Sequence, residues 1–120
     1  MTGAASQRRP CAYALLRTDK SEHVEAVETQ RLCDLAERLG FELRGVLAAE
    51  SDGNFASLFA SFELSGITAL LVPSALHMTG WMNVVRHHVD VWTLDPLGRW
   101  PRHCTPGRMI PFRPGLGGSR

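Results

Sequence analysis

Cysteine is scarce in this chain, lysine occurs once, and no long apolar run is present. The three cysteines, Cys11, Cys33 and Cys104, are widely spaced and form no CxxC pair, which argues against a disulfide framework or a zinc ribbon. No stretch approaches the ~18 consecutive apolar residues of a membrane helix, and no apolar run of signal-peptide length follows the first residues. We therefore expect no membrane association, a cytoplasmic location, and reduced Cys11 and Cys33 in the core.

Signatures of common enzyme classes are also missing. The chain contains neither a glycine-rich phosphate loop nor a G-x-S-x-G nucleophile turn. We predict no cofactor. What remains is a chain of 120 residues with 44% apolar residues, which is the size and composition of one globular domain.

The charge is divided unevenly along the chain. Residues 1–95 hold eight basic against twelve acidic residues, whereas residues 96–120 hold five arginines and no acid. The second segment also contains five of the seven prolines, so we predict a basic and largely irregular tail. This tail could contact nucleic acid or an acidic partner, or it could be a solvated end that binds nothing. The nucleic-acid candidates are Arg99, Arg102, Arg108 and Arg113.

Apolar patterns alternate between strand and helix signals after a flexible lead at residues 1–10. Short apolar runs predict strands at 11–16, 41–49, 67–72 and 89–94. Helical spacing predicts helices at 22–39, 55–66 and 75–88, the first with Val24, Val27, Leu32, Leu35, Ala36 and Leu39 on its apolar face.

This order predicts an α/β domain over residues 11–95. Right-handed crossovers place parallel strands in one sheet with helices on both faces. We predict a three-layer, flavodoxin-like sheet of four parallel strands in the order 2-1-3-4.

Ligands of such sheets bind at the carboxyl ends of the strands, near the point where the strand order reverses. Six polar residues are predicted to reach this edge as ligand candidates: Thr18, Asp19, Lys20, Asp52, Ser74 and His77. Thr18 or Ser74 could act as a nucleophile with His77 as its base. In the alternative interpretation, Thr18 and Ser74 cap helices and His77 lies on the surface.

Two further kinds of site are conceivable from the sequence. The acids Asp19, Glu50 and Asp52 resemble the acidic pocket of a response-regulator receiver, but Pro73-Ser74 stands where a receiver needs its phosphorylated Asp. A metal site from His77, His87, His88 and Cys104 is disfavoured, because adjacent histidines on a helix point in different directions. We predict no metal.

Five short strings occur in a familiar order along the chain: Tyr13-Ala14-Leu15-Leu16-Arg17-Thr18, Val27-Glu28-Thr29-Gln30, Gly40-Phe41-Glu42-Leu43, Ile67-Thr68-Ala69-Leu70-Leu71-Val72 and Thr105-Pro106-Gly107-Arg108. In order and spacing, the chain resembles the catalytic domain of the serine recombinases (resolvases and invertases) over roughly residues 11–95. The resemblance implies the same parallel α/β fold.

The chain differs from that family at the positions where the family has its catalytic residues. The matched strings put Arg17 where the family has its nucleophilic serine and Leu15 where it has a catalytic arginine. The family segment whose arginines hold the scissile phosphate falls on residues 73–78, where Ser74 and His77 stand and no arginine occurs. Phosphoryl transfer depends on cations placed around the phosphate, so the resemblance implies a degenerate, non-catalytic site. The family's oligomerisation helix and DNA-reading helix-turn-helix are not expected here.

Three functions are compatible with these observations. The first is a non-catalytic module that binds a protein partner or a second copy of itself, with weak, salt-sensitive DNA contact through the tail. The second is a small-ligand binder or enzyme that uses the strand-edge residues. The third is a DNA-binding protein related to site-specific recombination.

Overall fold

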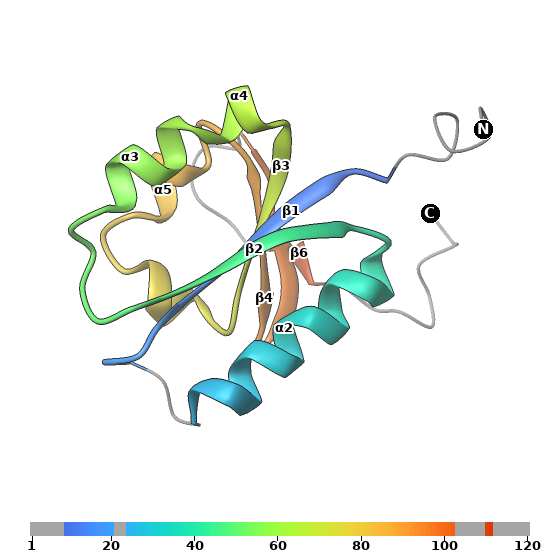
Figure 1. The fold of residues 1–120 in the computed structure, drawn as a ribbon, viewed down its shortest axis with the longest axis vertical. Helices are drawn as coiled ribbons and strands as arrows, with labels where there is room; N and C mark the ends of the chain where they lie inside the picture. The colour runs from blue at the N-terminus through green and yellow to red at the C-terminus, as the bar shows by residue number, and fades with distance from the viewer. Residues whose placement is uncertain (1–8, 21–23, 103–109, 112–120) are drawn as a thin grey trace.

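The computed structural model describes residues 9–20, 24–102 and 110–111, the last two by their backbone alone, as a sheet with helices on both faces (Figure 1). The elements are β1 (Cys11–Arg17), α2 (Glu25–Leu39), β2 (Glu42–Ala49), α3 (Phe55–Ala60), α4 (Phe62–Ser65), β3 (Ile67–Val72), the 3₁₀ helix η1 (Ala75–Met78), α5 (Met82–Val85), β4 (Asp90–Leu94), β5 (Leu97–Trp100) and β6 (Ile110–Pro111).

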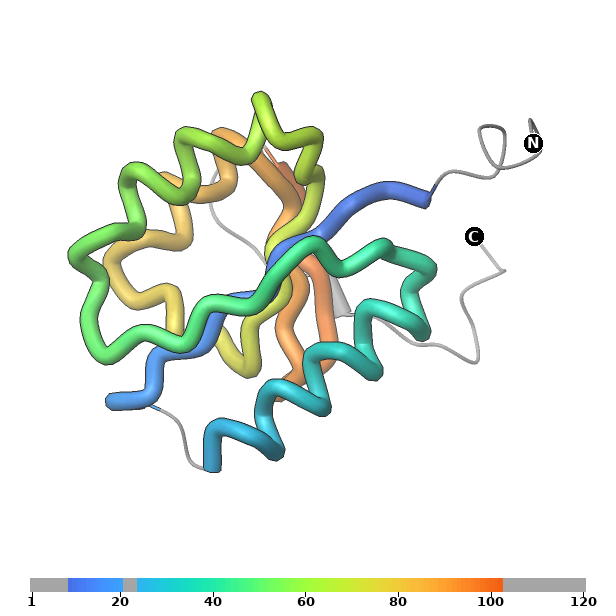
Figure 2. Tube along the Cα trace, in the orientation of Figure 1, coloured from blue at the N-terminus to red at the C-terminus, as the bar shows by residue number. Residues whose placement is uncertain are grey.

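The sheet has the order β2-β1-β3-β4-β5-β6 in the described residues. The first four strands are parallel and in the predicted order, with α2 carrying the chain from β1 to β2 (Figure 2). The prediction of an all-parallel, four-strand sheet is wrong, because β5 and β6 add antiparallel strands beyond β4. A tight connection through Asp95 and Pro96 turns the chain back, and β5 then pairs with β4 from Leu94↔Leu97 to Val91↔Trp100.

Helix α2 ends as its sequence indicates and buries the predicted face except in its first turn. Gly40 adopts φ +82° and donates its N–H to the carbonyls of Ala36 and Glu37, which is how a glycine closes a helix. Val24 and Val27, predicted on the apolar face, are exposed, whereas Glu28 is buried. The buried stripe runs from Glu28 along Leu32, Leu35 and Ala36, so its first turn carries a carboxylate where the pattern predicted valine.

The other helices are shorter than their patterns predict. The helix expected over 55–66 is divided at Ser61 into α3 and α4. The continuous helix expected over 75–88 is wrong: η1 and α5 replace it, separated by Gly80 at φ +82°. A left-handed residue breaks the helical ladder, and glycine adopts this conformation without a steric cost.

Two apolar layers cover the two faces of the sheet. Alternate residues of β1 point to opposite sides, as strand geometry requires. Ala12, Ala14 and Leu16 pack with α2, whereas Leu15 joins the cluster of α3 and α4. The second layer is aromatic, with Phe55, Phe59, Phe62 and Trp81 in successive ring contacts.

Several expectations fall partly outside the described residues. Most of the 1–10 lead, Cys104, Arg108 and Arg113 lie there. Cys11 and Cys33 are free thiols but are only partly buried, not core residues as expected. Across the part of the chain that the structure describes, no helix is both long and apolar enough to cross a membrane.

Candidate functional site

The sheet opens between β1 and β3 at its carboxyl edge. The pairing of these strands ends at Ala14↔Leu71, while β1 continues to Arg17 beside β2. The side chain of His77 fills this opening: the backbone N–H of Arg17 donates to its Nδ1 at 2.9 Å. His77 is only 2% exposed, so the interpretation that placed it on the surface is wrong. Its imidazole therefore accepts from a β1 N–H that lies beyond the last β1–β3 pair.

A pocket of about 210 Å³ lies at this opening. It is located at the reversal point of the strand order, where doubly wound sheets bind their ligands. Its apolar lining is Pro73 and Leu76, and its polar lining is Lys20, Glu28, Ser74, His77 and Asp95.

One wall of the pocket is a carboxylate network that joins α2 to Asp95, the residue after β4. Arg31 donates to Oε1 of Glu28 at 3.1 Å and to both carboxylate oxygens of Asp95 at 3.0 and 2.9 Å. One guanidinium therefore serves two carboxylates, which leaves the group with one net negative charge. The Glu28 side chain is 3% exposed, so it is desolvated more strongly than Asp95 at 58%. Glu28 is not among the site residues predicted from the sequence. Its position one turn before Leu32 places it on the apolar stripe of the helix, and this spacing could have indicated it.

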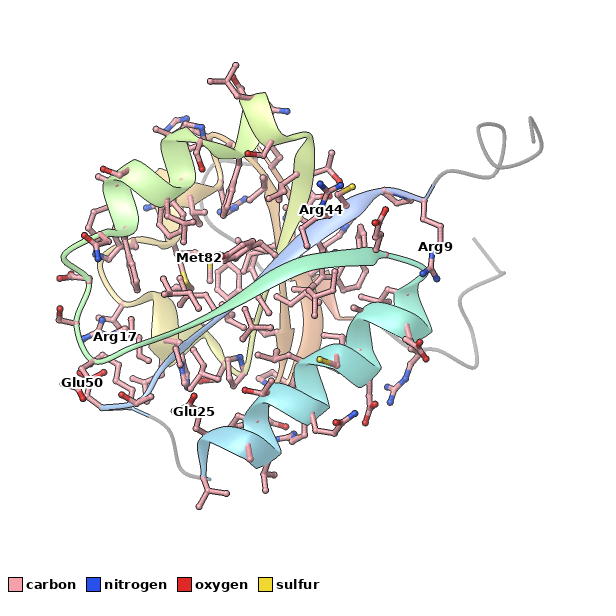
Figure 3. All side chains as sticks on the ribbon, in the orientation of Figure 1. Arg9, Arg17, Glu25, Arg44, Glu50 and Met82 are labelled. Atoms are coloured by element: carbon pink, nitrogen blue, oxygen red, sulfur yellow. The ribbon has the colours of Figure 1, made fainter. Side chains whose placement is uncertain are left out.

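Two positions that the resemblance matches to catalytic residues of the family, Leu15 and Arg17, lie on β1 and are buried. Leu15 is fully buried. The Arg17 guanidinium donates to both oxygens of Asp19 at 3.0 and 2.8 Å and lies 5.8 Å from the centre of the Phe55 ring. These Arg17 hydrogen bonds hold the pKa of Asp19 below its usual value. Arg17 is found beside Glu50 at the end where β1 and β2 finish (Figure 3).

The predicted strand-edge residues divide into two groups. Lys20, Ser74 and His77 line one pocket. Ser74 also caps η1, as one interpretation predicted, because its Oγ accepts from the N–H of Leu76. The other three do not line the pocket: Thr18 Oγ1 donates to the Ala49 carbonyl, Asp19 binds Arg17, and Asp52 accepts from Trp81 Nε1 at 2.7 Å.

The described arginines of the tail contact acids of the domain. Arg99 lies 4.0 Å from Asp90, and Arg102 lies 3.3 Å from Glu63. The backbone N–H of Arg102 also donates to Asp90 at 2.6 Å. Both side chains are about two-fifths exposed, at 42% and 43%. They are therefore partly neutralised before any nucleic acid approaches.

The environment of His77 favours its neutral form. Burial lowers the pKa of His77 most, the charges of Arg17 and Lys20 lower it further, and Asp19 opposes them. When the pH falls below the ordinary histidine pKa of 6.5, His77 takes up a proton in the unfolded chain but stays neutral in the folded chain. The stability that the neutral, buried His77 contributes is therefore complete above pH 6.5 and decreases as the pH falls below it.

We expect the free energy of unfolding to decrease between about pH 7 and about pH 5, where histidine titrates. His77→Asn should flatten this decrease, because an amide oxygen can accept from Arg17 but does not titrate. Urea unfolding across the range measures both proteins. An equal decrease in both would show that His77 is not the group responsible.

No group of three His, Cys, Asp or Glu side chains suited to a metal occurs within the described ranges. His87 and His88 follow the carboxyl end of α5, whereas His77 lies beside the end of β1. The structure does not bring these histidines together as metal ligands.

Comparison with solved structures finds the N-terminal catalytic domain of TP901-1 integrase. The TM-score is 0.54 over 73% of this chain and 80% of that chain, at 14% sequence identity. The chain has a recombinase-like fold. Comparisons with protein-family models and with curated proteins give no match. The recombinase-like α/β architecture implied by the five sequence strings is therefore supported by the three-dimensional arrangement.

Proposed function

We propose that this chain is a non-catalytic domain with a recombinase-like fold that acts as a protein-interaction or regulatory module. The observation that carries this proposal is that the four positions matched to family chemistry have structural partners. Leu15 packs in the core, Arg17 binds Asp19, Ser74 caps η1, and His77 accepts from the Arg17 backbone.

Phosphoryl transfer would need a nucleophile and free cations around one phosphate. Leu15 offers no charge, and the guanidinium of Arg17 is already bound by a carboxylate. The pocket beside them presents Lys20 together with the acids Glu28 and Asp95, which repel a phosphodiester. These features favour a domain in which the residues at the strand edge stabilise the fold and do not cleave DNA.

A second copy of the chain is the partner that we propose first. Val24 and Val27 are 67% and 47% exposed at the start of α2, and Leu76 is 52% exposed on the same pocket that Glu28 lines. We call these three side chains the apolar rim. An apolar surface beside polar residues is typical of a protein contact site.

Light scattering after size exclusion tests self-association. We expect the 13.2 kDa chain to have a larger mass that returns to the monomer value in Val24→Lys/Val27→Lys. Leu64→Lys, at a side chain 95% exposed on α4, is the matched control and should keep the larger mass. A wild-type monomer at every concentration would contradict self-association.

Weak DNA contact through the tail is a further part of the proposal, supported by the five arginines of residues 96–120. A deletion that begins after Arg102 keeps β5 in the sheet and removes only the two-residue edge strand β6 with the rest of the tail. We expect a weak mobility shift at about 50 mM salt, since few phosphates are neutralised, and its loss near 200 mM, where added salt lowers an already weak affinity. No shift of the full chain at the lower salt would end the DNA proposal.

The pocket supports a second candidate function, namely binding of a small ligand at the strand edge. It brings Lys20, Ser74 and His77 together at the reversal point of the sheet. Binding there requires none of the family's missing catalytic groups. The competing enzyme interpretation needs Ser74 or Thr18 activated by His77, and the structure records no hydrogen bond from either hydroxyl to that imidazole.

A further inference from the structure

Two buried polar side chains line the strand-edge pocket. His77 and Glu28 are each 2% exposed, yet both contribute to its lining. The Nδ1 of His77 accepts from Arg17, so the neutral ring carries its proton on Nε2. That Nε2–H has no hydrogen-bond partner in the described part of the chain. Because His77 lines the pocket, this donor is available to a ligand there.

The pocket presents hydrogen-bond donors and negative charge together. The donors are the Nε2–H of His77, the hydroxyl of Ser74 and the ammonium group of Lys20, which forms no ion pair with a described residue. The negative charge comes from Glu28 and Asp95, which share the single guanidinium of Arg31. A ligand that fits both groups must carry an acceptor or anion at one end and a cationic donor at the other.

The volume limits the size of that ligand. The pocket has a volume of about 210 Å³. Pockets for drug-sized molecules begin near 300 Å³. The space is therefore suited to a small metabolite.

We propose that this pocket binds a small zwitterion of the size of one α-amino acid. Its carboxylate would accept from Lys20, Ser74 and His77, and its ammonium group would donate to Glu28. A phosphate dianion fits less well because the buried carboxylate of Glu28 would repel it, and a simple amine leaves Lys20 unpaired. This inference rests on the second candidate function, and Leu76 is the one residue of the apolar rim that also lines the pocket.

Calorimetric titration of the full chain tests the proposal, with each standard α-amino acid as a probe. We expect at least one to bind with a Kd below about 1 mM, which is the weak end of specific affinities. The acetylated and amidated forms of that amino acid should bind at least about ten-fold more weakly, because each lacks one of the two charges.

Three variants locate the binding site. Glu28→Gln keeps an acceptor for Arg31 but removes the charge, and His77→Asn keeps the acceptor for Arg17 but removes the Nε2–H; each should weaken binding at least about ten-fold. Glu50→Gln removes an acid of the same edge that does not line the pocket and should leave affinity unchanged. Urea unfolding of each variant confirms that it is folded.

Three outcomes would overturn the zwitterion assignment. One is no binding by any amino acid at concentrations well above 1 mM. Another is tighter binding of inorganic phosphate than of every amino acid, which would make the pocket an anion site. The third is unchanged affinity in a folded Glu28→Gln. None of these outcomes alters the light-scattering result, so the interaction role is judged separately.

Discussion

Leu15→Arg should leave the domain largely unfolded. The substitution restores the arginine that the recombinase resemblance expects at this position, but here the side chain is fully buried in a cluster with Phe55, Phe59 and Phe62. A buried charge without a partner costs roughly 3–5 kcal/mol or more, and a domain of this size has only about 5–15 kcal/mol of stability.

Circular dichroism and urea unfolding would measure this effect. Leu15→Met is the matched control, because an apolar side chain of similar volume costs less than about 1.5 kcal/mol. A Leu15→Arg protein that is folded and within about 1 kcal/mol of the wild type would mean that the side chain can reach an open site. That result would contradict the burial described for this position.

Phe59→Ala should destabilise the domain by about 3–5 kcal/mol, the usual cost of deleting a buried aromatic ring. The Phe59 ring lies 5.5 Å from Phe55, 5.7 Å from Phe62 and 5.8 Å from Trp81, so its loss opens a cavity shared by three neighbours. This cluster packs α3, α4 and the segment before α5 against one face of the sheet.

The matched control for that prediction is Leu64→Ala. Leu64 is 95% exposed on α4, so its truncation should change stability by less than about 0.5 kcal/mol. Urea unfolding gives both values. Equal small effects at the two positions would contradict the packing described for α3.

The parallel part of the fold was predictable because its signals are local. Apolar runs such as Ile67–Val72 form strands buried on both faces, and Gly40 marks the end of α2. The antiparallel β5 was not, since its four residues follow Pro96 and resemble a loop. Its pairing depends on a chain reversal that places Leu97 beside Leu94.

The candidate site was predictable only in part, for physical reasons. The carboxyl edge of a parallel sheet gathers Lys20, Ser74 and His77 whatever the details of packing. The burial of His77 was not foreseeable, because it depends on β1 and β3 separating after Ala14↔Leu71. The burial of Glu28 was not predictable, because a glutamate is seldom buried without a partner and its partner Arg31 is known only from the fold.

The pH response and the pocket are linked through His77. The hydrogen bond from Arg17 fixes the ring tautomer and leaves Nε2–H as the donor that His77 can offer in the pocket that it lines. His77→Asn should therefore change two independent quantities, the pH dependence of stability and the affinity for a zwitterion. A change in both quantities would show that His77 stabilises the strand edge and also contacts the ligand.

Arg17→Ser tests the central claim most directly, because it puts the family's nucleophile type at its matched position. Functional sites are often stabilised when a catalytic residue is replaced, whereas structural positions lose stability. The unfolding free energy measured in urea should fall by about 1–2 kcal/mol, from lost stem packing and the cation–π contact with Phe55. Unchanged or increased stability would contradict a structural role for Arg17 and with it the account of a non-catalytic edge.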